Sequence, residues 1–567
     1  MYGDAMIHVK KVNDRFILSP INFLARFLAL AFLIATSVHA GADTYPRQPG
    51  VDALHYVFRL GLTDVSSEVT GETTITMKLL RDGIAELNLD LTSMTLATGM
   101  TVQSVRRGGP IDVPGPASDN IVFTHANDRL HVVLPPQSKA GEFTFTVRYR
   151  GTPAAGLRIG NNMHGDRTVF GENWPNLVRH WLPTIDHPSD KATSEFIVTA
   201  PNQYQVVANG LLIEELDLPN NMRLTHWKQS VPIASWLHTV AVARFSSHFA
   251  GSVDGIPIQT WVFPQDRDAG LQLFEDQSRR ALLFFSSQIG PYSYEKLANV
   301  QATGFTGGTE YASAIFYGEK GVSAGRGPVV HEIAHQWFGD SVTERDWDDV
   351  WLSEGFATYF ALLFTEHDEG RDAFVDGLQR SRAQVRQLEQ KLPDTPVIHR
   401  NLSDMSKVLN NLIYQKGGWV LHMLRNEVGT ENFWTAIREY YRRYRNANAS
   451  TAELRAVFEQ VSGKPLEWFF TQWLNRPGVP RIEGSWRYDG VKKAVEVIVT
   501  QSQAAAPFRI KLDVGIAAKA GELPRVQAIE LASKQGTYYF PADSAPAAVM
   551  LDPNTTLLFE AGTFLRR

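Results

Sequence analysis

The stretch His331-Glu332-Ile333-Ala334-His335, followed by Glu354 nineteen residues after the second histidine, decides how the rest of this 567-residue chain is interpreted. On a helix, His331 and His335 are four residues apart, so both imidazoles project from one face. Two imidazoles placed in this way can bind one Zn²⁺ at about 2.0–2.1 Å each. Glu332 lies one step round the helix, where it can act on the attacking water without being a ligand itself.

Glu354 is the candidate for a third metal ligand. It falls in a second predicted helix, from Trp351 to about Glu366, and can contribute a carboxylate oxygen. Three protein ligands leave a fourth position open for water, which is typical of catalytic rather than structural zinc. The HExxH pattern also occurs by chance on ordinary helices that bind no metal. The spaced third carboxylate is therefore what makes us expect one Zn²⁺ per chain.

The composition is that of an ordinary globular protein, and it excludes several kinds of site. Hydrophobic residues make up 44% of the chain and charged residues 20%, and a length of ~150 residues per domain predicts about three to four domains. The formal charge of −5, without a basic stripe, argues against nucleic-acid binding. The absence of cysteine excludes disulfides, Cys-ligated zinc and a thiol nucleophile. No feature of the sequence indicates an obligate protein partner.

The N-terminus has the pattern of a targeting segment. Basic residues, among them Lys10 and Arg26, precede the apolar run Phe27 to Val38, and the small residue Ala40 follows. The run is shorter than the ~20 residues that a transmembrane helix needs. We therefore expect residues 1–40 to be a signal peptide and the protein to be exported, either periplasmic or secreted. An uncleaved membrane anchor is the alternative.

The remaining sequence predicts an α+β protein of several domains. Residues 41–250 alternate in hydrophobicity, for example at Tyr56, Phe58 and Leu60, which predicts an N-terminal antiparallel β domain. Residues 251–480 are mainly helical. Residues 481–567 return to short alternating segments and predict a small C-terminal β-sandwich. Helices are expected at Phe274–Ile289, Pro328–Phe338, Trp351–Glu366, Ser406–Val428, Glu431–Tyr444 and Thr451–Val461.

Several blocks around the motif form a wider pattern. Gln336-Trp337-Phe338-Gly339-Asp340 continue the motif, and Trp347, Asp349, Trp351-Leu352 and Glu354-Gly355-Phe356-Ala357 follow. Further blocks occur, in chain order, at Arg179–Thr193, Gly307-Gly308-Thr309-Glu310, Tyr414-Gln415-Lys416-Gly417-Gly418, and Trp473, Gly478 and Pro480. Over roughly residues 45–480 the chain resembles the gluzincin aminopeptidases, the family of membrane alanyl aminopeptidase, aminopeptidase N and leukotriene hydrolase.

The resemblance implies a thermolysin-like catalytic domain and a zinc aminopeptidase that acts on peptides with a free N-terminus. It implies that Glu332 is the general base and that the Tyr414 phenol stabilises the oxyanion. It also implies that Glu310, with Gly307 and Gly308, binds the substrate and holds its α-amine. By spacing alone, Tyr414 lies off the apolar stripe of its helix, and the spacing does not decide between a packing role and a functional role for it.

The chain also departs from the family pattern. Thr309 stands where the family carries methionine, and Tyr311 where it carries asparagine, so the preferred first residue of the substrate stays open. In the family a β-domain glutamine or glutamate assists in holding the amine, and Glu172 is the weakly matching candidate here. Relatives usually carry a large helical C-terminal domain, whereas residues 481–567 are β-like. We therefore expect a more open cleft that longer peptides can enter.

Three other functions share the same zinc site. A zinc endopeptidase would not need Glu310. A different hydrolase on this scaffold, such as an epoxide hydrolase, would keep the metal ligands. A catalytically silent binding protein would be of another class altogether. Assays of aminoacyl-arylamides against N-blocked peptides separate these alternatives.

Overall fold

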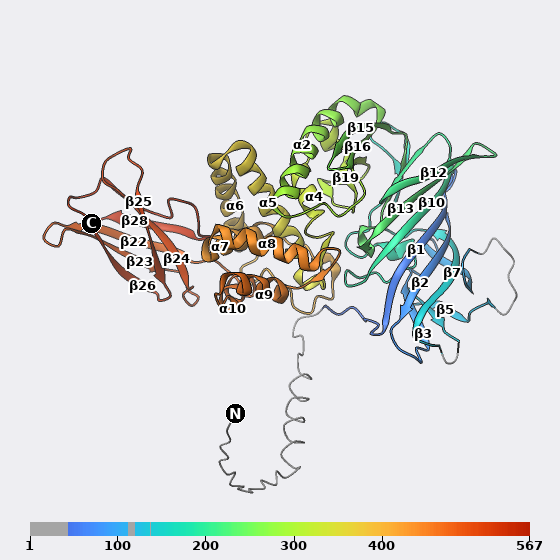
Figure 1. Ribbon diagram of the computed structural model, residues 1–567, viewed down its shortest axis with the longest axis horizontal. Coiled ribbons are helices and arrows are strands. Elements are labelled where there is room, and N and C mark those ends of the chain that lie inside the picture. Colours follow the sequence, from blue (N-terminus) through green and yellow to red (C-terminus); the bar gives the residue numbers. More distant parts are fainter. Residues whose placement is uncertain (1–42, 111–118, 136–137) are drawn as a thin grey trace, which may run out of the picture. The chain divides into compact units, whose positions relative to one another are not determined.

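The computed structural model describes residues 43–110, 119–135 and 138–567 (Figure 1). The signal peptide expected at residues 1–40 lies outside the described residues. Of the helices that are described, none combines the length and the apolar character that a membrane span requires.

The N-terminal region is built on a seven-stranded sheet with the order β12-β13-β10-β1-β2-β7-β4. Tyr56, Phe58 and Leu60 alternate along β1 and are buried, as expected from their period of two. Neighbouring strands are antiparallel except β1 and β10, which pair in parallel because a long connection through other strands separates them. The strands are β1 (Val51–Gly61), β2 (Val69–Leu79), β4 (Gly99–Arg107), β7 (Gly141–Thr152), β10 (Lys191–Pro201), β12 (Leu211–Leu218) and β13 (Met222–Ala234).

Two smaller sheets complete this region. One has the order β3-β6-β5 and the other β11-β14-β9-β8. The end of β9 carries the chain toward the helical region, where the Trp174 ring packs against Trp236 and Trp347 with centroids 4.6 and 4.9 Å away. The strands are β3 (Glu86–Asp90), β5 (Phe123–Ala126), β6 (Arg129–Val133), β8 (Leu157–Asn161), β9 (Arg167–Gly171), β11 (Gln205–Ala208) and β14 (Val240–Ala243).

The middle region begins with a five-stranded sheet of order β15-β16-β17-β19-β18. Its strands are β15 (Ser246–Val253), β16 (Ile256–Val262), β17 (Leu297–Ala302), β18 (Gly308–Thr309) and β19 (Ala314–Gly318). Because β15 pairs with β16, this sheet starts at Ser246, before the domain boundary expected at residue 250. The short strand β18 lies at the edge of the sheet and pairs antiparallel with β19.

Helices then dominate, and all six expected helices are present. They are α2 (Arg267–Gln288), α4 (Val329–His335), α5 (Trp351–Glu369), α7 (Asn411–Val428), α8 (Thr430–Tyr444) and α9 (Thr451–Ser462). The expected start of α7 at Ser406 is wrong, because Asn410 caps the helix by accepting from the backbone N–H groups of Leu412 and Ile413. Three further helices were not expected: α3 (Glu319–Ser323), α6 (Arg371–Lys391) and α10 (Glu467–Leu474).

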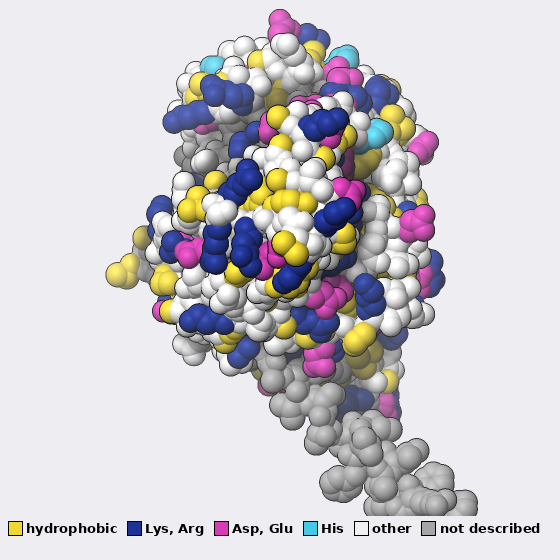
Figure 2. All heavy atoms as spheres, turned by 90° about the vertical axis from the view of Figure 1, so that its left-hand side faces the viewer, with side chains coloured by type: hydrophobic (Ala, Val, Ile, Leu, Met, Phe, Trp, Pro, Cys, Tyr) yellow, Lys and Arg dark blue, Asp and Glu magenta, His cyan; other side chains and the backbone are white. Residues whose placement is uncertain are grey.

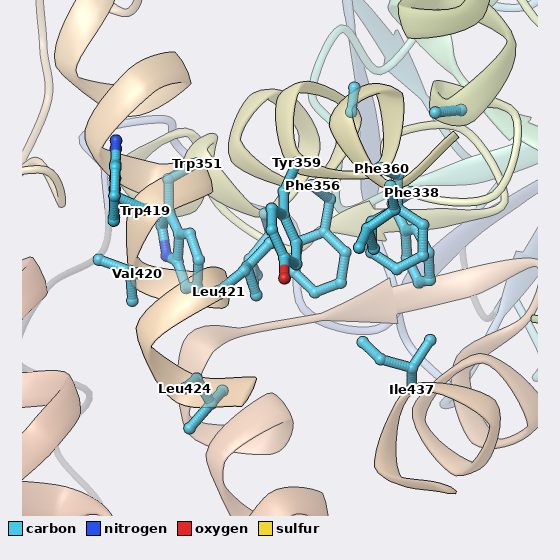
Figure 3. Packing of buried hydrophobic residues seen from close by; sticks show 14 of the residues in the cluster. Phe338, Trp351, Phe356, Tyr359, Phe360, Trp419, Val420, Leu421, Leu424 and Ile437 are labelled. Atoms are coloured by element: carbon cyan, nitrogen blue, oxygen red, sulfur yellow. The ribbon is translucent and has the colours of Figure 1, made fainter. Parts of the chain in front are cut away.

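Aromatic packing fixes one side of helix α5 (Figure 3). Phe356 and Phe360 of α5 lie against Phe338, just after α4, with ring centroids 4.5 and 5.1 Å apart. All three rings are fully buried. This contact sets the position of α5 relative to α4, and with it the direction of every side chain on the opposite face of α5.

Helices α5 and α7 touch at glycines. A Cβ added to Gly355 would lie 2.9 Å from the carbonyl carbon of Gly417, and one added to Gly417 would lie 3.1 Å from the Cα of Gly355. The backbones can approach this closely only because both positions lack a side chain. The close approach brings Tyr414 of α7 within reach of the first turn of α5.

The C-terminal region consists of two sheets, β26-β23-β22-β28 and β25-β24-β27. Buried residues of β23 and β24, such as Val497 and Leu512, belong to the same apolar cluster as the helices of the middle region. On the face shown in Figure 2, basic, acidic and apolar side chains are intermixed. The strands are β22 (Arg481–Asp489), β23 (Ala494–Gln501), β24 (Ile510–Ala517), β25 (Arg525–Leu531), β26 (Gln535–Pro541), β27 (Ala548–Leu551) and β28 (Glu560–Arg566). The expected fold class is thus confirmed.

The contact between α5 and α7 leads to a prediction about stability. We expect Gly355→Val to destabilise the protein by about 1–3 kcal/mol, because the new side chain has no room against the backbone of α7. Thermal unfolding measures the loss. Gly160→Val is the matched control, since a Cβ at Gly160 meets nothing within 4 Å. Equal melting temperatures for the two variants would contradict the prediction.

Candidate active site

Helices α4 and α5 bring together the three side chains that the motif nominates as metal ligands. The Nε2 atoms of His331 and His335 lie 3.2 Å apart. The Oε2 atom of Glu354 lies 3.5 Å from Nε2 of His331 and 3.3 Å from Nε2 of His335. His331 and His335 are one turn apart on α4, and Glu354 is in the first turn of α5, so two helices supply the cluster.

The cluster fits a zinc ion. Among the described residues, Oε2 of Glu354 is buried without a hydrogen-bond partner, which is costly for a carboxylate unless a cation is bound there. His335 Nδ1 contacts the Phe338 carbonyl oxygen at 3.2 Å and the Ser353 Oγ at 3.0 Å. A proton on Nδ1 that is donated to the carbonyl leaves the Nε2 lone pair free for a metal. Two imidazoles and one carboxylate are a ligand set of catalytic zinc.

Glu332 lies beside this cluster and contacts strand β18. It is buried, and a Cβ added to Gly308 would lie 2.5 Å from its carboxyl carbon. Gly308 therefore leaves the space that the Glu332 side chain occupies. Burial raises the pKa of Glu332 well above its usual value, and the neighbouring Glu310 carboxylate raises the pKa further.

Tyr414 of α7 also contributes to the wall of the site. Its hydroxyl donates to Oε1 of Glu354 at 2.7 Å, and its ring stacks on His331 with centroids 6.2 Å apart. Burial raises the pKa of Tyr414, and Glu354 raises it further, so the phenol keeps its proton and stays a donor.

Glu310 follows β18 and turns a carboxylate toward the same cluster. It is 6% exposed, and its Oε1 has no hydrogen-bond partner among the described residues. That oxygen lies 3.9 Å from Nδ1 of His335. Burial raises the pKa of Glu310 above its usual value. A cation bound at this oxygen would satisfy the carboxylate.

These residues line a pocket of about 670 Å³. Gly307 and Gly308 belong to its wall. Glu172 does not belong to it: its Oε1 accepts from Nη2 of Arg158 at 2.6 Å, and Trp174, two residues later, lines the pocket instead. The structure thus brings a neighbour of Glu172 to the site rather than Glu172 itself.

Helix α6 contributes pocket residues that sequence reasoning missed. They are Gly377, Arg380, Ser381 and Gln384. A signal was present, because Phe374, Leu378 and Val385 recur at helical spacing and are buried. The many polar residues of this segment obscure the pattern.

Other residues of the sequence blocks connect the regions. The Nζ of Lys416 pairs with Glu389 of α6 at 2.7 Å and donates to the Gly478 carbonyl at 2.9 Å. The Nζ of Lys191 donates to the carbonyl of Asp340, just after α4, at 2.9 Å. These lysines lie outside the metal cluster, and they hold its helices to the neighbouring regions.

Comparisons with known proteins agree with this arrangement. The Peptidase M1 N-terminal domain matches residues 52–237, and the Peptidase family M1 domain matches residues 279–473. The chain belongs to the peptidase M1 family. The gluzincin resemblance of the sequence is thereby confirmed, and zinc is the metal that this family membership implies.

Similar M1 proteins include the glutamyl aminopeptidase of Homo sapiens, 25% identical over 76% of this chain and 48% of that protein. The glutamyl aminopeptidase of Bitis rhinoceros is 28% identical over 55% of this chain and 36% of that protein. The chain thus spans about half, or less, of the length of these relatives.

Solved structures of the family agree as well. An M1 zinc metallopeptidase from Deinococcus radiodurans has a TM-score of 0.63 and 25% identity, over 76% of this chain and 95% of that chain. Legionella pneumophila aminopeptidase A in complex with aspartic acid has a TM-score of 0.76, over 92% of this chain and 60% of that chain. At 16% identity it shows the fold alone.

The ligand cluster predicts a zinc-dependent gain in stability. We expect a chelator to lower the melting temperature and added Zn²⁺ to restore it, because an ion that binds only the folded protein stabilises it by about 2.7 kcal/mol at 100 times its Kd. His335→Ala should abolish the response. His248→Ala, which alters a histidine paired with Glu275 on the surface, is the control and should retain it. An unchanged response in His335→Ala would contradict the assignment.

Proposed function

We propose that this chain is a zinc aminopeptidase that removes the first residue from peptides with a free N-terminus. The observation that carries the proposal is Glu310, a buried carboxylate in the pocket of the metal cluster, whose Oε1 has no hydrogen-bond partner among the described residues. A buried carboxylate needs a cation, and the protonated α-amine of a peptide is one. An internal peptide bond offers no ammonium group at that place, so Glu310 favours exopeptidase activity.

In this proposal His331, His335 and Glu354 hold one zinc ion per chain. When bound there, zinc supplies Lewis acidity, which lowers the pKa of water and polarises a carbonyl group. The open pocket side of the cluster, lined by Glu332 and Glu310, is where the substrate is placed.

Glu332 is the proposed general base. Its carboxylate lies on the pocket wall beside the ligand cluster, where it can take the proton of the attacking water. The same carboxyl group then gives this proton to the leaving amine, which cannot depart as an anion. Gly308 supports this role, because its missing side chain leaves room for Glu332.

Tyr414 is the proposed oxyanion donor. As water attacks, negative charge develops on the former carbonyl oxygen, and the phenolic hydroxyl on the pocket wall can donate to it. Its present acceptor is Oε1 of Glu354, so the hydroxyl is already oriented toward the ligand cluster.

The proposed mechanism does not determine which first residue of the peptide substrate the pocket prefers. Both relatives described above carry the name glutamyl aminopeptidase, and the pocket of this chain includes Thr309, the residue before Glu310. The expectation that longer peptides can enter the cleft stays a prediction.

From the pattern of residues 1–40 we further propose that the protein is exported.

One assay tests the proposed activity. Aminoacyl-arylamides with a free amine should be cleaved, and the same compounds with an acetylated amine should be spared. Cleavage of N-blocked peptides at internal bonds would instead indicate an endopeptidase. Zinc binding without any turnover would indicate a binding protein.

For the general base, we expect Glu332→Ala to abolish turnover while the protein retains its zinc, because Glu332 moves protons but is not a ligand. Metal analysis of the purified variant and arylamide kinetics measure the two effects. Loss of zinc together with turnover would show instead that Glu332 holds the metal.

For the amine site, we expect Glu310→Ala to lower kcat/KM for aminoacyl-arylamides by roughly 10²-fold or more, because the variant loses a buried charge-assisted contact worth several kcal/mol. Zinc content should stay near that of the wild type. Glu172→Ala is the control, since Glu172 pairs with Arg158 away from the pocket wall. Full activity of Glu310→Ala would refute this role.

A further inference from the structure

Arg380 is the charged residue of the pocket that the proposed mechanism does not use. The lining contains three carboxylates, those of Glu310, Glu332 and Glu354. Among the described residues that form this lining, Arg380 is the one lysine or arginine. The pocket therefore holds negative charge beside the ligand cluster and one positive charge on helix α6.

The position of Arg380 on the pocket wall follows from the geometry of two helices. The lining residues of α6 are three and four residues apart, so they share one face of the helix. Only Gly370 separates α5 from its neighbour α6 (Figure 1), and the contact of Gly377 with Leu362, residues about equally far from Gly370, pairs the two helices in antiparallel. The pocket face of α6 thus continues the face of α5 that carries Glu354.

The offset between Arg380 and the ligand cluster, measured along the axis of α5, follows from one contact. Gly377 lies against Leu362, because a Cβ added to it would be 2.5 Å from the Leu362 Cδ2. Arg380 is three residues further along α6 and so lies about level with Tyr359 of α5. Five residues separate that level from Glu354, which corresponds to about 7.5 Å along the helix axis.

Within the described ranges, Arg380 differs from every other arginine of α6 in having no ion-pair or side-chain hydrogen-bond partner. Arg371 pairs with Glu366 at 2.8 Å, Arg382 with Asp552 at 2.6 Å, and Arg386 with Glu560 at 4.0 Å. For Arg380 there is no ion pair or side-chain hydrogen bond within the part of the chain that the structure describes. Its guanidinium is exposed on the pocket wall, where a ligand can reach it.

We infer that Arg380 binds a carboxylate of the substrate and so helps to decide which peptides the pocket accepts. The inference rests on the proposed function, in which Glu310 holds the ammonium group and fixes the substrate's direction. The planar guanidinium offers two parallel N–H groups that match the two oxygens of a carboxylate. A pocket of about 670 Å³ is within the usual size range for a small ligand such as a short peptide.

The carboxylate has two chemical sources, and a pair of substrates isolates each. One pair is trialanine with a free C-terminus and trialanine amide, which differ only in the C-terminal charge. The other pair is the arylamide of glutamate and the arylamide of glutamine, which differ only in the charge of the first side chain. The readout is the ratio of kcat/KM within each pair.

We expect the wild type to favour the charged member of at least one pair. Arg380→Gln should lower that ratio roughly tenfold, the size of one charge-assisted hydrogen bond, and the change should fall mainly on KM. Arg380→Lys, which keeps the charge without the planar fork, should retain part of the preference. Arg380→Glu should reverse the preference, so that the neutral member of the pair is the better substrate. The pair whose ratio changes identifies the source of the carboxylate.

Arg386→Gln is the matched control, because Arg386 lies on the same helix and outside the pocket lining. Both ratios should stay as in the wild type. Ratios that are equal in the wild type and in Arg380→Gln would overturn the inference while leaving the aminopeptidase intact.

A binding measurement decides the same question without turnover. In zinc-loaded Glu332→Ala, calorimetry gives the Kd of trialanine, trialanine amide, glutamate α-amide and glutamine α-amide, so that the members of each pair differ by one carboxylate. Adding Arg380→Gln should weaken the charged member of the affected pair about tenfold and spare its neutral partner. Equal weakening of both members, or none, would overturn the inference. Wild-type protein that cleaves no free-amine substrate would refute the proposed function separately.

Discussion

Helices α5 and α7 touch through Gly355 and Gly417, and the geometry of the candidate site depends on this contact. Gly355 directly follows the candidate ligand Glu354, and Gly417 lies about one turn after Tyr414. Because neither glycine has a side chain, the phenol reaches the carboxylate at 2.7 Å. On its other face, α5 packs through Phe356 and Phe360 against Phe338 next to α4. The packing of α5 against α7 on one face and against Phe338 on the other thus positions the Glu354 carboxylate and the Tyr414 hydroxyl relative to each other.

The pocket concentrates carboxylates away from water. Glu310, Glu332 and Glu354 are each at most 6% exposed, and two of them have an oxygen without a partner among the described residues. Such a group of buried carboxylates costs free energy unless cations accompany it. A zinc ion and a substrate ammonium group are the two cations that the proposed reaction provides. Arg380, on the wall formed by α6, lies where it can bind a carboxylate of the substrate.

Comparison of the sequence expectations with the structure shows where local patterns suffice. The period of two in β1 and the helical spacing in α8 and α9 were sufficient, because each of these elements buries one face. Helix α6 was missed because its apolar residues are sparse among charged ones. Glu172 was placed in the right neighbourhood, but its pairing with Arg158 depends on a strand neighbour, which spacing along the chain does not reveal.

The sequence by itself predicted the candidate metal ligands and the candidate general base and determined the order of β, helical and β regions, since each depends on residues close together or on periodicity within one element. Only the tertiary structure decided that Glu310 approaches His335, that Trp174 rather than Glu172 lines the pocket, and that α6 supplies Arg380. These contacts join residues far apart in the chain, and packing between helices and sheets sets them. No local pattern encodes such distances.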